Sequence, residues 1–154
     1  MARRAPSNDP AWHPASTSLA FMRQLWTLAH ALDVRSKWMA RHLGVTGPQR
    51  LVVRMIGQRP SVSAGELARL LDLHPSTLTG ILARLRARRL IVAVRDPEDR
   101  RRVRLSLTAA GRAIDRHRRG TVEAAVQAAL ATVPARDRMA AERVLAAVRA
   151  QLAR

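Results

Sequence analysis

The sequence predicts a mainly α-helical protein with one small β-hairpin, and three observations support this fold class. Apolar residues recur at helical spacing over most of the chain. Near the middle, two short helical segments are separated by a link of about three residues. Two β-rich segments then flank an arginine-rich turn. The 154 residues have the length of one domain, and the aliphatic composition, with one Phe and no Tyr, disfavours a β-sandwich or barrel.

The first part of the chain predicts an arm followed by a long helix. Residues 1–16 are rich in proline and polar residues, so we expect them to form a flexible N-terminal arm. Hydroxyl side chains at 16–18 can cap the next helix, and apolar residues repeat through it until Gly44 ends it. We assign residues 17–45 to this helix and expect it to contribute to dimerisation.

Two capped helices follow. Thr46 can cap the first, and Pro48 suits its first turn. Ser63 and Glu66 have the spacing of a capping box, in which the serine caps the next helix and the glutamate reaches back to the serine amide. The tight link that ends at His74 joins this helix to the following one, an arrangement typical of a helix-turn-helix.

The helix that follows His74 has two distinct faces. Leucine and isoleucine at 78, 81, 82 and 85 form one apolar stripe. The opposite face carries Ser76, Thr79, Gly80 and Ala83, and Thr77 and Arg84 flank it. Small and hydroxyl side chains permit close approach to a major groove, and an arginine can reach guanine. An ordinary solvated face is the alternative, but such faces usually carry acidic residues, and none occurs between positions 74 and 95.

The segment after residue 90 predicts a hairpin with a basic tip. Residues 91–94 and 103–107 have strand composition and flank a turn that contains Asp99, Arg100, Arg101 and Arg102. An arginine at such a tip can enter the narrow, electronegative minor groove of DNA, and a neighbouring carboxylate such as Asp99 can orient it. An exposed turn rich in ion pairs is the alternative. Residues 46–108 are therefore predicted to form a winged helix-turn-helix that binds double-stranded DNA.

Residues 109–154 are predicted to form C-terminal helices whose apolar sides exceed what the core of the winged helix-turn-helix can bury. Thr108 can cap a long helix that has a weak point at Gly120, and Pro134 separates it from a second helix. Both helices have apolar sides, as does the helix at 17–45. This surplus of apolar surface indicates a partner, and for a DNA-binding protein we expect a second copy of the chain in a homodimer.

Net charge, the absence of cysteine and the spacing of the histidines limit which kinds of partner and site the protein can have. The formal net charge of +17 is compatible with a polyanionic partner, although a codon bias towards arginine accounts for part of the composition, since Lys37 is the single lysine. The absence of Cys excludes disulfides and thiolate metal sites, and the five histidines have no metal-binding spacing. We expect no enzymatic activity, no cofactor, no membrane span or secretory signal, and a cytoplasmic location.

A ligand site is a further expectation. Trp38 and His42 lie one helical turn apart near the end of the first helix, and Arg50 and Arg54 share a face of the second. Together these four residues could hold an aromatic anion at the junction of the two helices. The alternative for Trp38 and His42 is that they are packing residues at a domain junction.

Residues 62–111 resemble the MarR family of bacterial transcriptional regulators. The resemblance lies in the segment HPSTLTGILARL, in the run from Asp96 to Arg101, and in LTAAG at 107–111. It implies a dimer formed by the terminal helices and DNA contacts from Ser76, Thr77, Thr79 and Arg84. It also implies that Arg101 is the arginine of the wing tip with Asp99 as its partner, and that a small aromatic or anionic effector releases DNA. The order of elements extends the resemblance to about 18–153.

Two departures from the family pattern stand out. Arg89 occupies the position at which the family usually has glycine, between the recognition helix and the first strand of the wing, so a different helix end or some strain is expected. Gly80 replaces a longer polar or basic residue, which shifts the expected DNA contacts towards the wing. The sequence thus predicts a homodimeric, ligand-responsive repressor. A non-specific architectural DNA-binding protein without an effector is the alternative.

Overall fold

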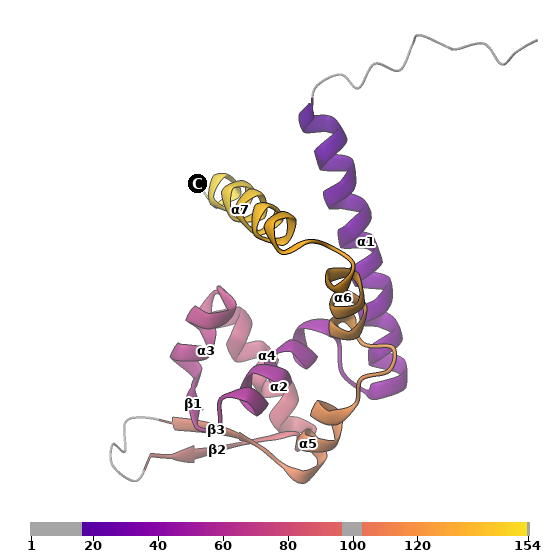
Figure 1. The fold of residues 1–154 in the computed structure, drawn as a ribbon. Helices are drawn as coiled ribbons and strands as arrows, with labels where there is room; N and C mark the ends of the chain where they lie inside the picture. Colours follow the sequence, from indigo (N-terminus) through magenta and orange to yellow (C-terminus); the bar gives the residue numbers. More distant parts are fainter. Residues whose placement is uncertain (1–16, 97–102, 154) are drawn as a thin grey trace, which may run out of the picture.

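The structure is a computed structural model that describes residues 17–96 and 103–153 (Figure 1). Its described elements are α1 (Thr17–Leu43), α2 (Gly47–Gln58), β1 (Val62–Ser63), α3 (Ala64–Leu71), α4 (Pro75–Ala87), β2 (Ile91–Arg95), β3 (Val103–Leu107), α5 (Ala109–Arg116), α6 (Val122–Ala131) and α7 (Ala135–Leu152). The three strands form an antiparallel sheet in the order β1-β3-β2. The predicted class, mainly α with a small hairpin, is confirmed. The short strand β1 was not predicted.

The helix starts follow the predicted capping chemistry. The Thr46 hydroxyl accepts from the Gln49 amide at 3.4 Å, and the Gln49 side chain accepts from the Thr46 amide at 3.0 Å. Ser63 and Glu66 form the predicted capping box, with the corresponding distances of 3.2 and 2.9 Å. These reciprocal bonds satisfy amides that have no partner within the helix, so each helix has a defined first residue.

The core of the winged helix-turn-helix lies between α2, α3, α4 and the sheet. The leucine and isoleucine stripe of α4 is buried in it, as the helical spacing predicted. Val52, Val53 and Ile56 of α2 and Leu67 of α3 face this stripe from the other elements of the same cluster. Because one side of α4 is held so firmly, its opposite side is presented to solvent in a fixed orientation.

The chain leaves α4 through a strained residue. Arg89 has a left-handed backbone with φ +54°, a conformation that favours glycine. Such a backbone costs a residue with a Cβ about 1–2 kcal/mol. It is held by hydrogen bonds from the amides of Arg89 and Leu90 to carbonyls of the last turn of α4, at 2.8 and 3.0 Å. The expected strain at this departure from the family pattern is therefore present.

The long helix predicted after Thr108 is divided in two. Residues 109–116 form α5, and α6 begins only at Val122, with Thr121 as its N-cap. The break contains Gly120, whose φ of +74° is incompatible with a continuing helix. The prediction of one helix from Thr108 to Val133 was therefore wrong. Apolar residues keep an approximately helical spacing across the connection, so this spacing does not reveal the turn.

Gly111 sets how closely α5 packs on the sheet. It is buried, and a Cβ at this position would collide with the carbonyl oxygen of Leu90 at the start of β2. Only glycine allows this approach of α5, which follows the wing directly in the chain. The segment LTAAG therefore has a packing role as well as a capping one, since Thr108 also accepts from the Gly111 amide at 3.0 Å.

The terminal helices expose apolar side chains. In Figure 1, α1 extends beyond the other elements. An ion pair between Arg149 of α7 and Asp72, the C-cap of α3, joins α7 to the winged region. Trp26 is 70% exposed and Leu152 is 81% exposed. Large apolar residues that are also exposed occur on α1 (Leu19, Met22, Leu28, Leu32, Val34), on α6 (Val126, Leu130) and on α7 (Met139, Val144, Leu145). No helix in the described part of the chain is long and apolar enough to cross a membrane.

Candidate nucleic-acid interface

The outward face of α4 carries the side chains predicted to contact DNA. Ser76, Thr77, Thr79 and Arg84 are all exposed, on the side opposite the buried stripe. The structure therefore places all four on one accessible surface. No acidic residue lies within α4, and Arg84 and Arg86 lie in its last turn. This surface has the positive charge and small side chains that a nucleic-acid groove accepts.

The hydroxyls at the start of α4 differ in what they can still bind. Thr79 donates its hydroxyl hydrogen to the Pro75 carbonyl at 2.8 Å, which leaves its oxygen as an acceptor. The Ser76 hydroxyl lies 2.7 Å from Nδ1 of His74. Among the described residues, Thr77 has no side-chain hydrogen bond, so its hydroxyl is available to donate to a phosphate or a base edge.

His74 is the N-cap of α4, a role that sequence reasoning missed. Its Nδ1 accepts from the Ser76 amide at 3.3 Å, so this ring nitrogen satisfies an amide at the helix start. Histidine is not among the usual N-cap residues, so residue type gave no signal for this role.

Gly80 occupies the middle of the exposed face. A Cβ at this position would meet nothing within 4 Å, so neither packing nor a close backbone approach requires glycine here. The absence of a side chain leaves a shallow point between Thr77 and Arg84. This is compatible with close approach of a ligand to the helix backbone.

The base of the wing is ordered by a buried carboxylate. Arg104 on β3 donates through Nε to Asp96 at 2.6 Å, and Asp96 is only 6% exposed. The hairpin register, with Arg95 opposite Val103, brings the two strands together just before the tip. Sequence reasoning assigned the orienting role to Asp99; at the base of the hairpin Asp96 has this role for Arg104. Asp99, Arg100, Arg101 and Arg102 lie outside the described residues.

The residues predicted to bind a ligand are divided between two environments. Trp38 and His42 stack with ring centroids 4.3 Å apart, and Nδ1 of His42 lies 2.9 Å from the Trp38 carbonyl. A Cβ on Gly120 would come within 2.5 Å of the Trp38 ring, so the tryptophan packs directly on the α5–α6 connection. The packing role weighed for Trp38 is therefore present in the structure.

Arg50 lies in the interior rather than on a ligand-facing surface. It is 1% exposed and donates to the carbonyls of Ile114, Asp115 and His117 and, at 2.6 Å through Nε, to Glu123. Its guanidinium therefore joins α2 to the end of α5, to the connection and to the start of α6. All of these partners are internal, so Arg50 is a structural hub in this conformation.

Two further groups belong to this network. Arg54 donates to the Asp115 carboxylate at 2.7 Å, and both side chains are about one-fifth exposed. Burial tends to raise the pKa of Glu123, but the hydrogen bond and the charge of Arg50 outweigh burial and hold this pKa below its ordinary value of 4.5. Glu123 is thus an ionised partner of a buried cation at neutral pH.

No group of three or more His, Asp or Glu side chains that could hold a metal ion occurs within residues 17–96 and 103–153. The winged helix-turn-helix, with an exposed face on α4 that carries no acidic residue, is by its fold a member of a DNA-binding class of proteins.

Comparison with known proteins gives the family. Residues 43–102 match the model of the MarR family. The chain is 30% identical over 103 residues to the HTH-type transcriptional repressor Mb2911 of Mycobacterium bovis, a match that covers 67% of this chain and 74% of that protein. It is 31% identical over 101 residues to the HTH-type transcriptional regulator TtmR of Methylorubrum extorquens, covering 66% of this chain but only about half, 52%, of that relative.

The fold has solved counterparts. The crystal structure of the S. aureus MepR–DNA complex is similar, with a TM-score of 0.72 at 15% identity, over 89% of this chain and 99% of that one. At this identity the likeness concerns the fold alone. With the match to the relatives, it places the chain plainly: it belongs to the MarR family of transcriptional regulators.

Proposed function

We propose that the protein is a homodimeric, sequence-specific DNA-binding repressor whose binding is relieved by a small aromatic or anionic ligand. The observation that carries DNA recognition is the exposed face of α4. It combines available hydroxyls at the N-terminus, an arginine near the C-terminus and no acidic residue, on a helix whose other side is fixed in the core. A helix of this kind fits a major groove, where Arg84 would bind guanine and Thr77 a phosphate or base edge.

The dimer is supported by the exposed apolar residues of the terminal helices. They occur on α1, α6 and α7, on elements that the core of the winged helix-turn-helix does not cover. A surface rich in exposed large apolar side chains usually marks an interaction site. A second copy is the partner that suits DNA recognition, because a two-fold dimer presents two recognition helices to two half-sites. Light scattering behind size exclusion should give twice the mass of one chain.

The effector remains a proposal that rests on the stacked Trp38–His42 pair. These rings lie at the contact of α1 with the α5–α6 connection, where a bound aromatic ring would alter the link between the terminal helices and the winged region. Titration with a panel of aromatic carboxylates, followed by tryptophan fluorescence and release of DNA, tests it. No response across the panel, or an unchanged response in Trp38→Leu, would count against this site.

Selection of bound sequences from random duplex DNA tests the function itself. We expect one enriched motif, and fluorescence anisotropy should then show at least ~10³-fold tighter binding to it than to a scrambled duplex at the same salt concentration. Arg84→Gln should weaken specific binding by about 10-fold or more, corresponding to the loss of one base contact. Arg119→Gln removes the same charge from an exposed loop residue and should have little effect. Arg101→Ala tests the wing in the same assay.

The second candidate is a non-specific architectural DNA-binding protein. It is favoured by the net charge of +17 and by the small side chains on α4. It predicts that scrambling the duplex changes affinity little and that each removed arginine weakens binding alike, through the salt-dependent phosphate term. A selection that enriches no motif would support this candidate over the repressor.

A further inference from the structure

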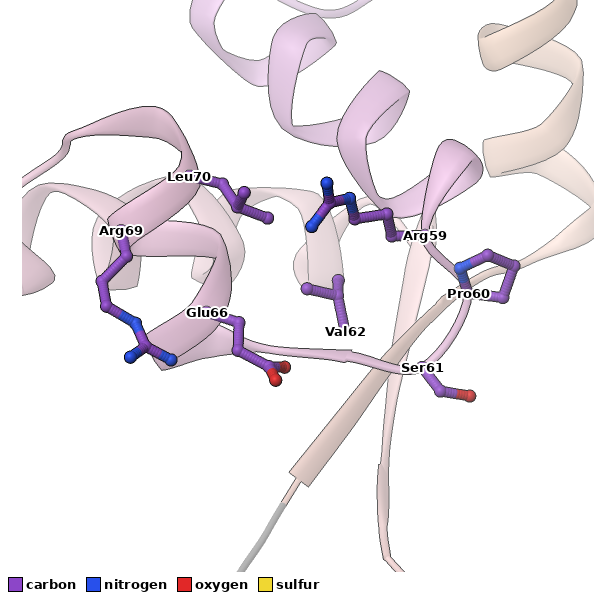
Figure 2. A pocket seen from close by; sticks show the side chains of 7 residues that line it. All are labelled: Arg59, Pro60, Ser61, Val62, Glu66, Arg69 and Leu70. Carbon is purple, nitrogen blue, oxygen red and sulfur yellow. The ribbon is translucent and has the colours of Figure 1, made fainter.

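A groove lies between the end of α2 and α3, and its lining includes neither the Trp38–His42 pair nor any residue of α4. Its volume is about 500 Å³, within the range of roughly 300–1,000 Å³ found for small-molecule sites. Figure 2 shows the side chains that line it. They come from the end of α2 and the turn after it (Arg59, Pro60, Ser61), from β1 (Val62) and from α3 (Glu66, Arg69, Leu70).

The cations of this groove have no partner within the described protein. Neither Arg59 nor Arg69 makes a side-chain hydrogen bond or ion pair with another described residue. The one carboxylate in the lining, Glu66, is engaged in the capping box, where it accepts from the amide and the hydroxyl of Ser63 at 2.9 and 2.8 Å. The groove therefore presents guanidinium donors that an anion can use, in contrast to Arg50, whose donors have internal partners.

The same groove has an aliphatic wall. In Figure 2, Arg59, Val62 and Leu70 turn towards the space between α2 and α3, and the Ser61 hydroxyl points away from it. Leu70 is 40% exposed, which is high for a leucine beside a cavity, and Val62 forms a buried floor at 6%. None of the described residues that line the groove is aromatic. One guanidinium that faces aliphatic side chains suits a ligand with one charged end and an aliphatic remainder.

The backbone holds this arrangement in place. Ser61 has a left-handed conformation, with φ +70°, and its amide donates to the Leu105 carbonyl at 3.2 Å. The strained residue turns the chain sharply between Arg59 and Val62, so the cation and the apolar floor face the same space. Strained backbone of this kind persists only where the surrounding structure fixes it, and it is common at functional sites.

We propose that this groove binds a small aliphatic carboxylate, with Arg59 holding the carboxylate and Val62 and Leu70 contacting the hydrocarbon chain. Arg69 lies at the rim and adds positive charge. A bidentate guanidinium–carboxylate contact gives specificity for the carboxylate, and the aliphatic wall gives specificity for the hydrocarbon chain of the ligand. The inference goes beyond the proposed function, because binding here is independent of any DNA contact.

The experiment is calorimetric titration of the whole protein, without DNA, with octanoate and with octan-1-ol as the matched neutral compound. Octanoate should bind saturably with one site per chain, and octan-1-ol should bind at least ~10-fold more weakly, since it lacks the charged contact. Arg59→Gln should weaken octanoate binding by about 10-fold or more, and Arg59→Lys by less, because lysine keeps the charge but not the fork. Arg119→Gln should leave binding unchanged.

Several outcomes would overturn the proposal. Equal weakening in Arg59→Gln and Arg119→Gln would mean that octanoate responds only to net charge. Equal affinities for octanoate and octan-1-ol would leave Arg59 without a role. If Arg59→Gln leaves octanoate binding intact but weakens DNA binding, its guanidinium contacts phosphate instead. Circular dichroism of each variant shows that it is folded, and because no DNA is present in the titration, a failure here leaves the proposed repressor function untouched.

Discussion

Replacement of Arg50 by methionine should destabilise the protein strongly. Methionine keeps much of the length of the side chain but removes every donor. It leaves Glu123 without its buried cation and three carbonyls, those of Ile114, Asp115 and His117, without the guanidinium that joins them. The effect should fall on the contact between α2 and the α5–α6 connection, because all of these bonds cross it.

The magnitude follows from burial. Arg50 is 1% exposed, and removing one member of a buried, hydrogen-bonded ion pair costs about 3–5 kcal/mol. Glu123 is about one-third exposed, so water can partly solvate it, and we expect a value near the lower end. A domain of this size has roughly 5–15 kcal/mol of stability in total. The loss corresponds to a fall of about 6–12 °C in the melting temperature.

The assay is urea unfolding followed by circular dichroism at 222 nm, at one fixed chain concentration because a dimer would couple stability to concentration. Arg119→Met, which removes an exposed arginine near the same connection, is the matched control and should change stability by less than about 0.5 kcal/mol. If Arg50→Met lost less than about 1 kcal/mol yet abolished a ligand response, Arg50 would be a ligand residue and the structural assignment would be wrong.

Three further predictions concern single positions. Because the pKa of Glu123 is lowered in the folded state, its contribution to stability is present above pH 4.5 and is lost as the pH falls through the folded pKa. Glu123→Gln should remove this part of the acid dependence, which urea unfolding at a series of pH values measures. An unchanged pH profile of stability would contradict this role of Glu123. Gly80→Ala should raise the free energy of unfolding by about 1 kcal/mol, since a Cβ has open space in a helix there; any destabilisation would speak against the described packing of α4. Gly111→Ala should lower the free energy of unfolding by ~1–3 kcal/mol, because its Cβ would meet the Leu90 carbonyl. A melting temperature equal to that of the wild type would refute this close approach.

The winged helix-turn-helix could be predicted from the sequence because its signals are local. The caps at Thr46 and Ser63 each involve a partner three positions further on, and the stripe from Leu78 to Leu85 spans two helical turns. Interactions at this distance are determined by residue type and spacing alone. The exposed side of α4 followed directly, since the face opposite a buried stripe must point outward.

The features that sequence reasoning missed depend on distant parts of the chain. Arg50 meets partners that follow it by 64 to 73 residues, so its helical neighbours gave no sign that it is buried. The two-residue strand β1 exists only because Val62 and Ser63 pair with Leu105 and Arg104 of β3. In the break after α5, Gly120 has a left-handed backbone and packs against Trp38 of α1, a contact between distant parts of the chain that apolar spacing in the segment itself does not encode.

Hydroxyl-radical footprinting on a duplex carrying the selected motif is the most direct test of the central claim, that two α4 helices of a dimer recognise DNA together. The account predicts two protected half-sites related by two-fold symmetry, with centres about one helical turn, roughly 10 base pairs, apart. Arg84→Gln should weaken both half-sites equally, because each copy contributes the same residue. Protection of a single half-site, or uniform protection without symmetry, would contradict recognition by a symmetric pair of α4 helices.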